Sequence, residues 1–174
     1  MRKVVLTYGV LAGVIIVALM VFSFSVLSFS EGSSMSMVLG YATMIVSLSM
    51  IFFGIRNYRD NYSGGSVTFG RGFLIGLYIS IIASLFYVIG WKIYSSIALP
   101  DFADKYAKHM IDHLKKSGAN DSTIIAKTKE MADWKQMYAN PFFEYGMTFL
   151  EIFPVGLLIS VICALILKRK PKMG

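Results

Sequence analysis

Four long apolar stretches dominate this sequence and limit what it can fold into. They are Val4 to Phe29, Met35 to Ile55, Phe73 to Leu99, and Phe142 to Leu167. Crossing the hydrocarbon core of a bilayer takes about 20 apolar residues in a helix. Each stretch is apolar all round, unlike the amphipathic helices of soluble proteins. Only 16% of the residues are charged, against about 25% in soluble domains. We therefore expect an all-α polytopic membrane protein, one domain over residues 1–174 with four transmembrane helices.

The first stretch has an alternative interpretation as a signal peptide, because Arg2 and Lys3 precede it. The apolar part of a signal peptide is usually only about 7–15 residues long, and a small-x-small cleavage site follows it. The first stretch is longer than that, and Ser28-Phe29-Ser30 is a poor substitute for the cleavage site. We therefore expect four spans, with three as the alternative if this segment is removed.

The distribution of positive charge predicts the orientation of the spans. The cations that lie next to span ends would all share one side if the chain crosses four times: Arg2, Lys3, Arg56, Arg59, Arg71, Lys168, Arg169, Lys170 and Lys172. The other side holds Glu31 and the segment 100–141, where seven lysines face six acids. By the positive-inside rule, both termini are cytoplasmic. The net charge of +7 thus fits a membrane surface, and no nucleic-acid-binding motif accompanies it.

The segment 100–141 is expected to form a helical hairpin outside the membrane. Pro100 ends the third span, because proline cannot continue the hydrogen-bond ladder, and Asp101 can cap a new helix. From Phe102 to Leu114 the apolar residues share one helical face, opposite a charged face. Gly118 suits the turn that ends this helix.

A second helix starts at Asp121 or Ser122 and stops before Asn140-Pro141. The apolar faces of the two helices must pack on each other, on the span ends, or in the interfacial layer. Aromatic residues near this end would form a belt at the outer membrane surface: Trp91, Tyr94, Trp134, Tyr138, Phe142 and Phe143.

Charged residues inside the spans are the first candidate for chemistry. Lys92 and Glu151 each lie about two turns inside the outer end of their span, and Glu144 shares the face of Glu151 one heptad earlier. An ionised group at the bilayer centre costs about 3 kcal/mol or more, so it usually faces a partner or water. We expect a contact between Lys92 and Glu151. Its favoured role is to hold two helices together, and the alternative is to carry protons or bind a substrate.

Two histidines form the second candidate. His109 and His113 are four residues apart at the edge of the apolar face of the first hairpin helix, a spacing that can ligate zinc. The sequence between them does not match the metalloprotease motif. A third ligand would have to come from Asp101, Asp112 or the second helix. Histidines at such a boundary are more often metal-free, so we expect no cofactor.

The loop between the second and third spans is the third candidate. Arg56, Arg59 and Arg71 flank a glycine-rich segment there. Arginines and open glycine amides next to a helix N-terminus can hold a phosphate or an anionic lipid headgroup. The simpler interpretation, a turn with positive-inside arginines and Thr68 near the start of the third span, is sufficient alone.

Small residues recur at four-residue spacing in two of the spans. They are Gly9 and Gly13 in the first, and Gly72, Gly76, Ser80 and Ser84 in the third. Such rows let helix backbones approach closely. Packing within one chain is the default, and a homo-oligomer through these faces is the alternative.

Several of these segments together carry a family resemblance. They are the arginine-tyrosine segment after the second span, Ser-Val-Thr-Phe-Gly (66–70), Gly-Leu-Tyr-Ile-Ser-Ile-Ile-Ala-Ser (76–84), the long insert, Asn-Pro-Phe-Phe-Glu (140–144), Glu-Ile-Phe-Pro-Val-Gly (151–156) and the basic tail. In order and spacing the chain resembles the membrane family catalogued as domain of unknown function 4199, found mainly in Gram-negative bacteria of the Bacteroidetes group. The resemblance implies an inner-membrane location and, with the charge rule, a periplasmic hairpin. It transfers no catalytic residues.

These observations favour a non-enzymatic structural or interaction component of the inner membrane. No nucleophile–base pair or cofactor motif stands out. The alternative is a small transporter or transport subunit that uses Lys92, Glu144 and Glu151. The bilayer is the one partner that the sequence implies directly.

Overall fold

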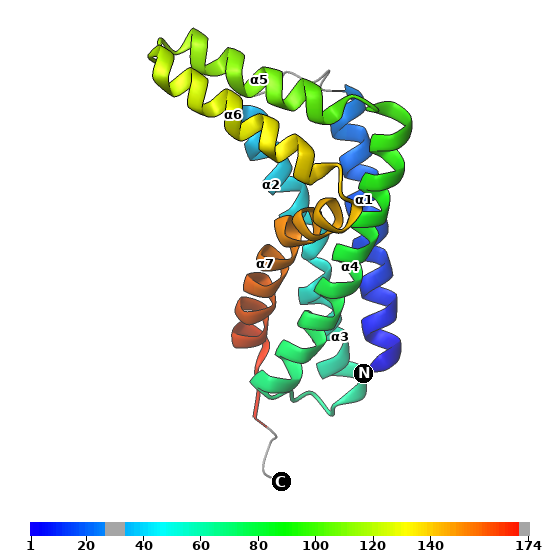
Figure 1. Cartoon of the computed structure of the whole chain (residues 1–174). Helices are drawn as coiled ribbons and strands as arrows, with labels where there is room; N and C mark the ends of the chain where they lie inside the picture. The colour runs from blue at the N-terminus through cyan, green and yellow to red at the C-terminus, as the bar shows by residue number, and fades with distance from the viewer. Residues whose placement is uncertain (27–33, 171–174) are drawn as a thin grey trace.

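The computed structural model describes residues 1–26 and 34–170. Within those ranges the chain is helical apart from turns and a single antiparallel bridge between Val67 and Arg169. The helices, shown in Figure 1, are α1 (Arg2–Val26), α2 (Ser34–Leu48), α3 (Met50–Tyr62), α4 (Phe69–Ala98), α5 (Phe102–Lys116), α6 (Asp121–Tyr138) and α7 (Pro141–Leu167). The all-α prediction is confirmed.

Four segments of the described chain are long and apolar enough to cross a bilayer: Arg2–Ser25, Val38–Tyr62, Phe69–Ala98 and Pro141–Leu167. The prediction of a four-span membrane protein is thereby confirmed. The second span extends past its predicted end at Ile55 to Tyr62, and the third begins at Phe69 rather than at Phe73. Several predicted features lie outside the described residues: the end of the first span at Phe29, the Ser28–Ser30 segment, Glu31 and Lys172.

The second span is interrupted, which the sequence did not lead us to expect. Its predicted single helix, Met35 to Ile55, is divided at Ser49 into α2 and α3. There the Phe52 amide donates to the Ser49 carbonyl (3.0 Å), and the Ser49 hydroxyl donates back to the Val46 carbonyl (2.6 Å). Ser49 keeps helical backbone angles (φ −57°, ψ −21°), so α2 and α3 together form one span, Val38–Tyr62. The apolar composition hides the break, because no proline or glycine marks it.

Helix α4 is the central element of the bundle. It packs most extensively against α7 and α1. Gly9 faces Ile82 and Gly13 faces Phe86, so α1 and α4 run parallel and residue numbers rise together along both helices. α7 runs in the opposite direction (Figure 1).

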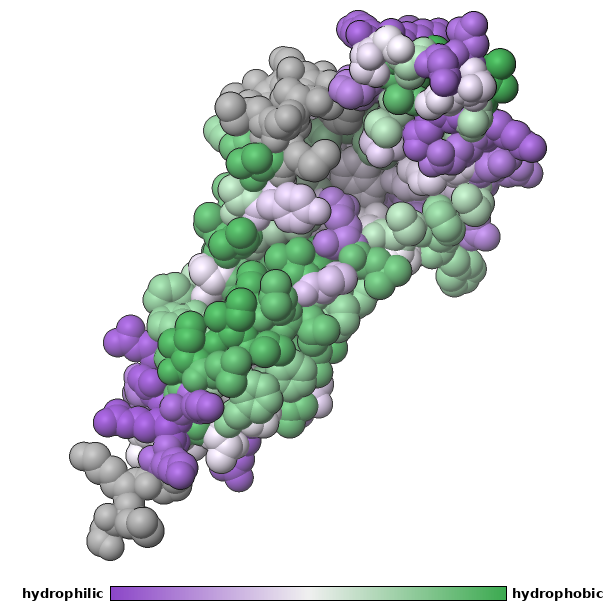
Figure 2. All heavy atoms as spheres, turned by 90° about the vertical axis from the view of Figure 1, so that its left-hand side faces the viewer, coloured by the Kyte–Doolittle hydropathy of each residue, from purple (hydrophilic) through white to green (hydrophobic). Residues whose placement is uncertain are grey.

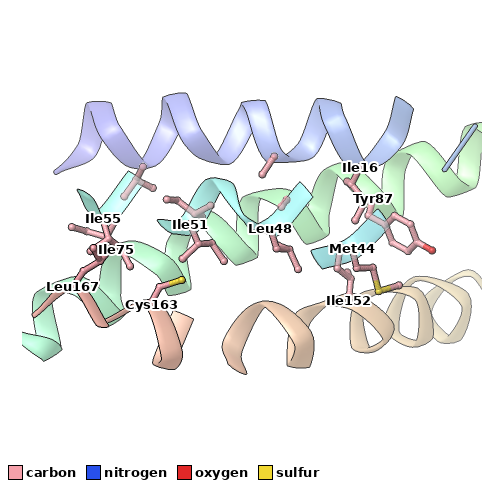
Figure 3. Close-up of a cluster of buried hydrophobic side chains, with 14 of the residues drawn as sticks. Ile16, Met44, Leu48, Ile51, Ile55, Ile75, Tyr87, Ile152, Cys163 and Leu167 are labelled. Atoms are coloured by element: carbon pink, nitrogen blue, oxygen red, sulfur yellow. The ribbon is translucent and has the colours of Figure 1, made fainter. Parts of the chain in front are cut away.

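The core lies along the axis of the bundle and is lined by all four spans. On the face shown in Figure 2, the hydrophobic residues fill the middle of the molecule and the hydrophilic residues gather at its two ends. Many of the outward-facing side chains of the spans are large and apolar, among them Val14, Ile45, Ile89 and Leu158, which suits a lipid environment. In Figure 3 branched side chains from α1, α2, α3, α4 and α7 meet along the axis, among them Ile16, Leu48, Ile51, Ile75 and Ile152. These five side chains are at most 1% exposed.

Helices α5 and α6 form the expected hairpin, which runs across the ends of the spans (Figure 1). Gly118 adopts a positive φ of 75° and ends α5, as predicted. The Asn120 side chain accepts the Thr123 amide at 2.9 Å and caps α6. Asp101 holds the N-cap position of α5, but its side chain makes no capping hydrogen bond. The expected capping role of Asp101 was therefore wrong.

Candidate functional site

The contact between α4 and α7 follows one antiparallel register. A Cβ atom placed on Gly76 would lie 2.7 Å from the Ser160 hydroxyl, and one on Gly156 would lie 2.7 Å from the Ser80 hydroxyl. Gly72 lies against Ala164 one turn further. Each four-residue step forward along α4 is therefore matched by a four-residue step back along α7. Small residues on both helices allow this close approach.

Hydroxyl groups occupy the centre of the interface between α4 and α7. The Ser80 and Ser160 oxygens are 3.1 Å apart, and both residues have no exposed surface. Each hydroxyl also donates to a carbonyl one turn earlier in its own helix, Gly76 or Gly156. Their hydrogen-bonding groups are thus satisfied inside the close contact between α4 and α7, which we call the seam.

An ion pair closes the end of this seam that lies next to the hairpin. Lys92 Nζ of α4 lies 2.7 Å from Glu144 Oε2 of α7. The side chain of Glu144 is 7% exposed, and that of Lys92 is 43% exposed. We refer to this pair as the clasp, because it joins the end of α4, where the chain enters the hairpin, to the start of α7, where it leaves. The predicted contact of Lys92 with Glu151 was wrong. Side-chain depth alone suggested that pairing, whereas the register of the seam places Glu144 opposite Lys92.

Glu151 occupies a different position, beside a buried tyrosine. It lies close to Tyr87 of α4, a residue that is 8% exposed. In Figure 3 the Tyr87 ring lies next to Met44 and Ile152, with its hydroxyl directed toward the hairpin end of the bundle. Glu151 itself is exposed and forms no ion pair with the residues that the structure describes. The three predicted intramembrane ionisable residues therefore divide into a clasp and a separate acid.

Five aromatic residues at the base of the hairpin form what we call the aromatic joint: Trp91, Phe102, Tyr106, Trp134 and Tyr138. Trp91 Nε1 donates to the Tyr138 hydroxyl at 2.9 Å. The Phe102 ring meets Trp91 edge-on at 4.8 Å, and Trp134 stacks on Tyr138 at 4.7 Å. Offset and edge-on pairs of this kind are favourable beyond the area they bury. The joint fixes both hairpin helices to the end of α4.

Tyr138 titrates in an unusual environment. Burial, chiefly, raises the pKa of its phenol, and the nearby carboxylates of Glu144 and Glu151 raise it further, while the hydrogen bond from Trp91 acts in the opposite direction. Both a carboxylate and a low-dielectric surrounding disfavour a phenolate. The Tyr138 hydroxyl therefore stays protonated and accepts the Trp91 hydrogen bond over the whole physiological range.

His109 and His113 lie next to each other on α5, with ring centroids 6.4 Å apart. In the part of the chain that the structure describes, no group of three histidine, cysteine, aspartate or glutamate side chains is arranged to hold a metal ion. The third ligand proposed from Asp101, Asp112 or α6 is therefore not supplied by that part of the chain. Zinc binding stays a prediction that rests on the two histidines alone.

In the loop between α3 and α4, three backbone amides donate hydrogen bonds to carbonyls of the protein itself. The Gly65 amide donates to the Arg59 carbonyl (2.9 Å) and closes the end of α3, with Gly64 and Gly65 at positive φ. The Ser66 amide donates to Ser63, and the Val67 amide donates to Arg169. These three amides are not available to a phosphate, so the structure supports the simpler interpretation of a turn.

The three arginines that flank this loop lie in α3 and α4 and differ in their contacts. Arg59 pairs with Asp60 at 2.7 Å, and Arg56 lies 3.6 Å from the same carboxylate. Arg71 is in the first turn of α4, where its amide donates to the Thr68 hydroxyl that caps the helix. The capping role of Thr68 agrees with its predicted place at the start of the span. Contact of Arg56, Arg59 and Arg71 with anionic headgroups stays a prediction.

The small-residue rows are used within the chain. Gly9 and Gly13 of α1 receive Ile82 and Phe86 of α4, and the α4 row packs on α7 in the seam described above. The default interpretation of these rows is the one that the structure shows.

Comparison with known protein families gives a match that spans most of the chain. The model of the family described as "Protein of unknown function (DUF4199)" matches residues 7–169. The chain belongs to this family. The match covers α4, the whole hairpin and the seam to α7, so these features lie inside the region that defines the family. No curated protein and no solved structure matches the chain.

Proposed function

We propose that this protein is a non-enzymatic component of the bacterial inner membrane that displays a rigid helical hairpin on the periplasmic side. The observation that carries the proposal is the way the hairpin is held. Its two ends emerge next to the clasp, and its base is fixed by the aromatic joint. Interaction surfaces of this kind work best when presented on a rigid support, because less ordering is then needed on binding.

The character of the seam supports a structural role for the clasp. Side chains fill the space between α4 and α7 so closely that a methyl group at Gly76 or Gly156 would overlap a serine. Pathways for ions or protons need polar groups that face water or one another in a chain. The Ser80 and Ser160 hydroxyls do face each other, but both are fully buried and each donates to a carbonyl of its own helix.

A second candidate function is transport, and one observation favours it. Glu151 is an exposed carboxyl group inside a span, next to Tyr87, and it is not a member of the clasp. Intramembrane acids with no cation beside them are typical of proton and substrate pathways. The runner-up function would therefore depend on Glu151 more than on Lys92 or Glu144.

Proteoliposomes distinguish the two functions. Purified protein is reconstituted with a pH-sensitive dye inside the vesicles, and proton flux is measured after a pH jump, with empty vesicles as the reference. The interaction proposal predicts that the wild type and Glu151→Gln both match the empty vesicles. A flux present in the wild type and lost in a folded Glu151→Gln protein, but retained in Glu130→Gln on the hairpin surface, would favour transport.

A further inference from the structure

A groove runs along one side of the hairpin, between α5 and α6, with a volume of about 530 Å³. Its floor is apolar and includes Ala107 and Met131, which are 7% and 5% exposed. Ile111 lies half-buried along the same floor. We call this surface the hairpin groove. Neither the clasp nor the aromatic joint uses it.

The α5 side of the hairpin groove carries charges of alternating sign. In chain order they are Asp104, Lys108, Asp112 and Lys115, spaced so that all of them face the groove. Lys135 of α6 forms an ion pair with Asp104. Lys108 and Asp112, at the centre of the row, have no ion-pair partner within the described residues. The centre of the groove therefore offers one cation and one anion, one helical turn apart, that the described residues leave unpaired.

This arrangement is complementary to itself. Two copies of a protein inserted in a membrane with the same topology can form a closed pair only around a two-fold axis along the membrane normal, so that residue i of one copy meets residue j of the other and j meets i. α5 runs across the ends of the spans (Figure 1), so such an axis makes the two α5 helices antiparallel. With the axis near Ile111, Lys108 of each copy faces Asp112 of the other. The pairing occurs twice, and the two Ile111 side chains meet between the ion pairs.

The other surface that the sequence suggested for contacts between copies is already buried within one chain. The rows of small residues in α1 and α4, which would otherwise suit contacts between copies, pack against other helices of the same chain. An association between copies then needs a surface outside the bundle, and the hairpin groove is such a surface.

We propose that the hairpin groove binds the same groove of a second copy of this chain, through reciprocal Lys108–Asp112 ion pairs around a central Ile111 contact. The proposal rests on the interaction function proposed above and names its partner. Exposed ion pairs are individually weak, so their main effect is to fix the register of the two hairpins. Confinement to a membrane raises the effective concentration of the partner and lets a small interface suffice.

Charge reversal provides a test that a folding defect cannot mimic. Wild type, Lys108→Glu and Asp112→Lys are reconstituted separately in vesicles at one protein-to-lipid ratio, and the dimer fraction is measured by single-molecule photobleaching. Each single variant replaces two attractive contacts with two repulsive ones, so we expect its dimer to be weaker on the order of tenfold.

An equimolar mixture of the two variants restores both attractive contacts. The glutamate introduced in one copy faces the lysine introduced in the other, and the unchanged Asp112 of the first copy faces the unchanged Lys108 of the second. We expect the mixture to form heterodimers with wild-type affinity.

The control is Lys129→Glu, an equal charge change on an exposed position of α6 outside the groove, which should dimerise like the wild type. Restored pairing in the mixture supports the proposal. A monomeric wild type, or single variants that dimerise as well as the wild type, would overturn it. In either of those cases the absence of proton flux would still leave the proposed non-transport function standing, so the two proposals fail separately.

Discussion

Lys92 and Glu144 face each other because they continue the register that packs Gly76 on Ser160 and Ser80 on Gly156. The ion pair is thus a consequence of backbone approach between α4 and α7. Its two members are unequal, since the Glu144 side chain is almost fully buried and the Lys92 side chain is almost half exposed.

The difference in burial between Lys92 and Glu144 predicts which single variant destabilises the protein more. Lys92→Met leaves a buried carboxylate without its cation, which should lower the free energy of unfolding by about 3 kcal/mol. Glu144→Gln leaves a lysine that reaches water unaided, and its cost should be about 1 kcal/mol. Unfolding by SDS titration from mild detergent micelles measures both. Because apolar pairs of similar volume can replace a buried ion pair, the double variant Lys92→Met/Glu144→Met should recover most of the loss. The reverse order of the single variants would contradict this account.

The close packing of the seam predicts that alanine has different effects on stability at two glycines of α7. Gly156→Ala places a Cβ 2.8 Å from the Ser80 Cβ, an overlap that rotation of the hydroxyl cannot relieve, so the helices must separate. We expect a loss of about 1–3 kcal/mol in the free energy of unfolding. Gly146→Ala is the matched control, because a Cβ there meets nothing within 4 Å. It should be neutral or stabilise α7 by about 0.5–1 kcal/mol. Equal effects at the two sites would show that the seam is loose.

The aromatic joint predicts a pH dependence at alkaline pH. The pKa of Tyr138 is raised in the folded chain above its unfolded value of about 10. Its contribution is therefore complete below pH 10 and is lost as the pH rises from there through the folded pKa. Wild-type stability should fall relative to Tyr138→Phe by up to about 1.4 kcal/mol per pH unit in that window. Amide hydrogen exchange in α5 and α6, compared between the two proteins, measures the loss. Parallel pH profiles would exclude a role for this phenol.

The orientation proposed from the positive-inside rule predicts the accessibility of two positions. In a Cys163→Ser background, Ser117→Cys at the tip of the hairpin should react with a membrane-impermeant maleimide in intact spheroplasts. Asn61→Cys, at the exposed end of α3, should react only after lysis. The opposite pattern would place the hairpin in the cytoplasm.

Span count and hairpin were predictable because they depend on local properties. Length and hydropathy identify the spans, Pro100 and Asn140 mark the two ends of the hairpin, and Gly118 marks its turn. The partner of Lys92 was not predicted, because depth in the membrane leaves several carboxylates equally suitable. The row Gly156, Ser160 and Ala164 contains the missing signal. Aligned antiparallel with Gly72, Gly76 and Ser80, it sets Lys92 against Glu144.

Other features depend on contacts between distant segments and have no local signature. The hydrogen bond from Trp91 to Tyr138 joins residues 47 positions apart, and aromatic residues near a membrane surface are common whatever they contact. The break at Ser49 uses a serine in an apolar run, where a hydroxyl bonded to its own helix usually leaves the helix intact. Tyr87 likewise carries no distinguishing signal in the sequence, because only the packing of α7 brings Glu151 next to it.

The small bridge between Val67 and Arg169 has a consequence for how the chain can be divided. It ties the residue just before α4 to a residue just after α7, while the clasp ties the same two helices at their other ends. Residues 67–169 are thus a loop fastened twice, and the described residues of α1 to α3 pack against it through their side chains. A chain cut between Gly64 and Gly65 should accordingly yield two pieces that associate in the membrane, as the subunits of a two-subunit complex do.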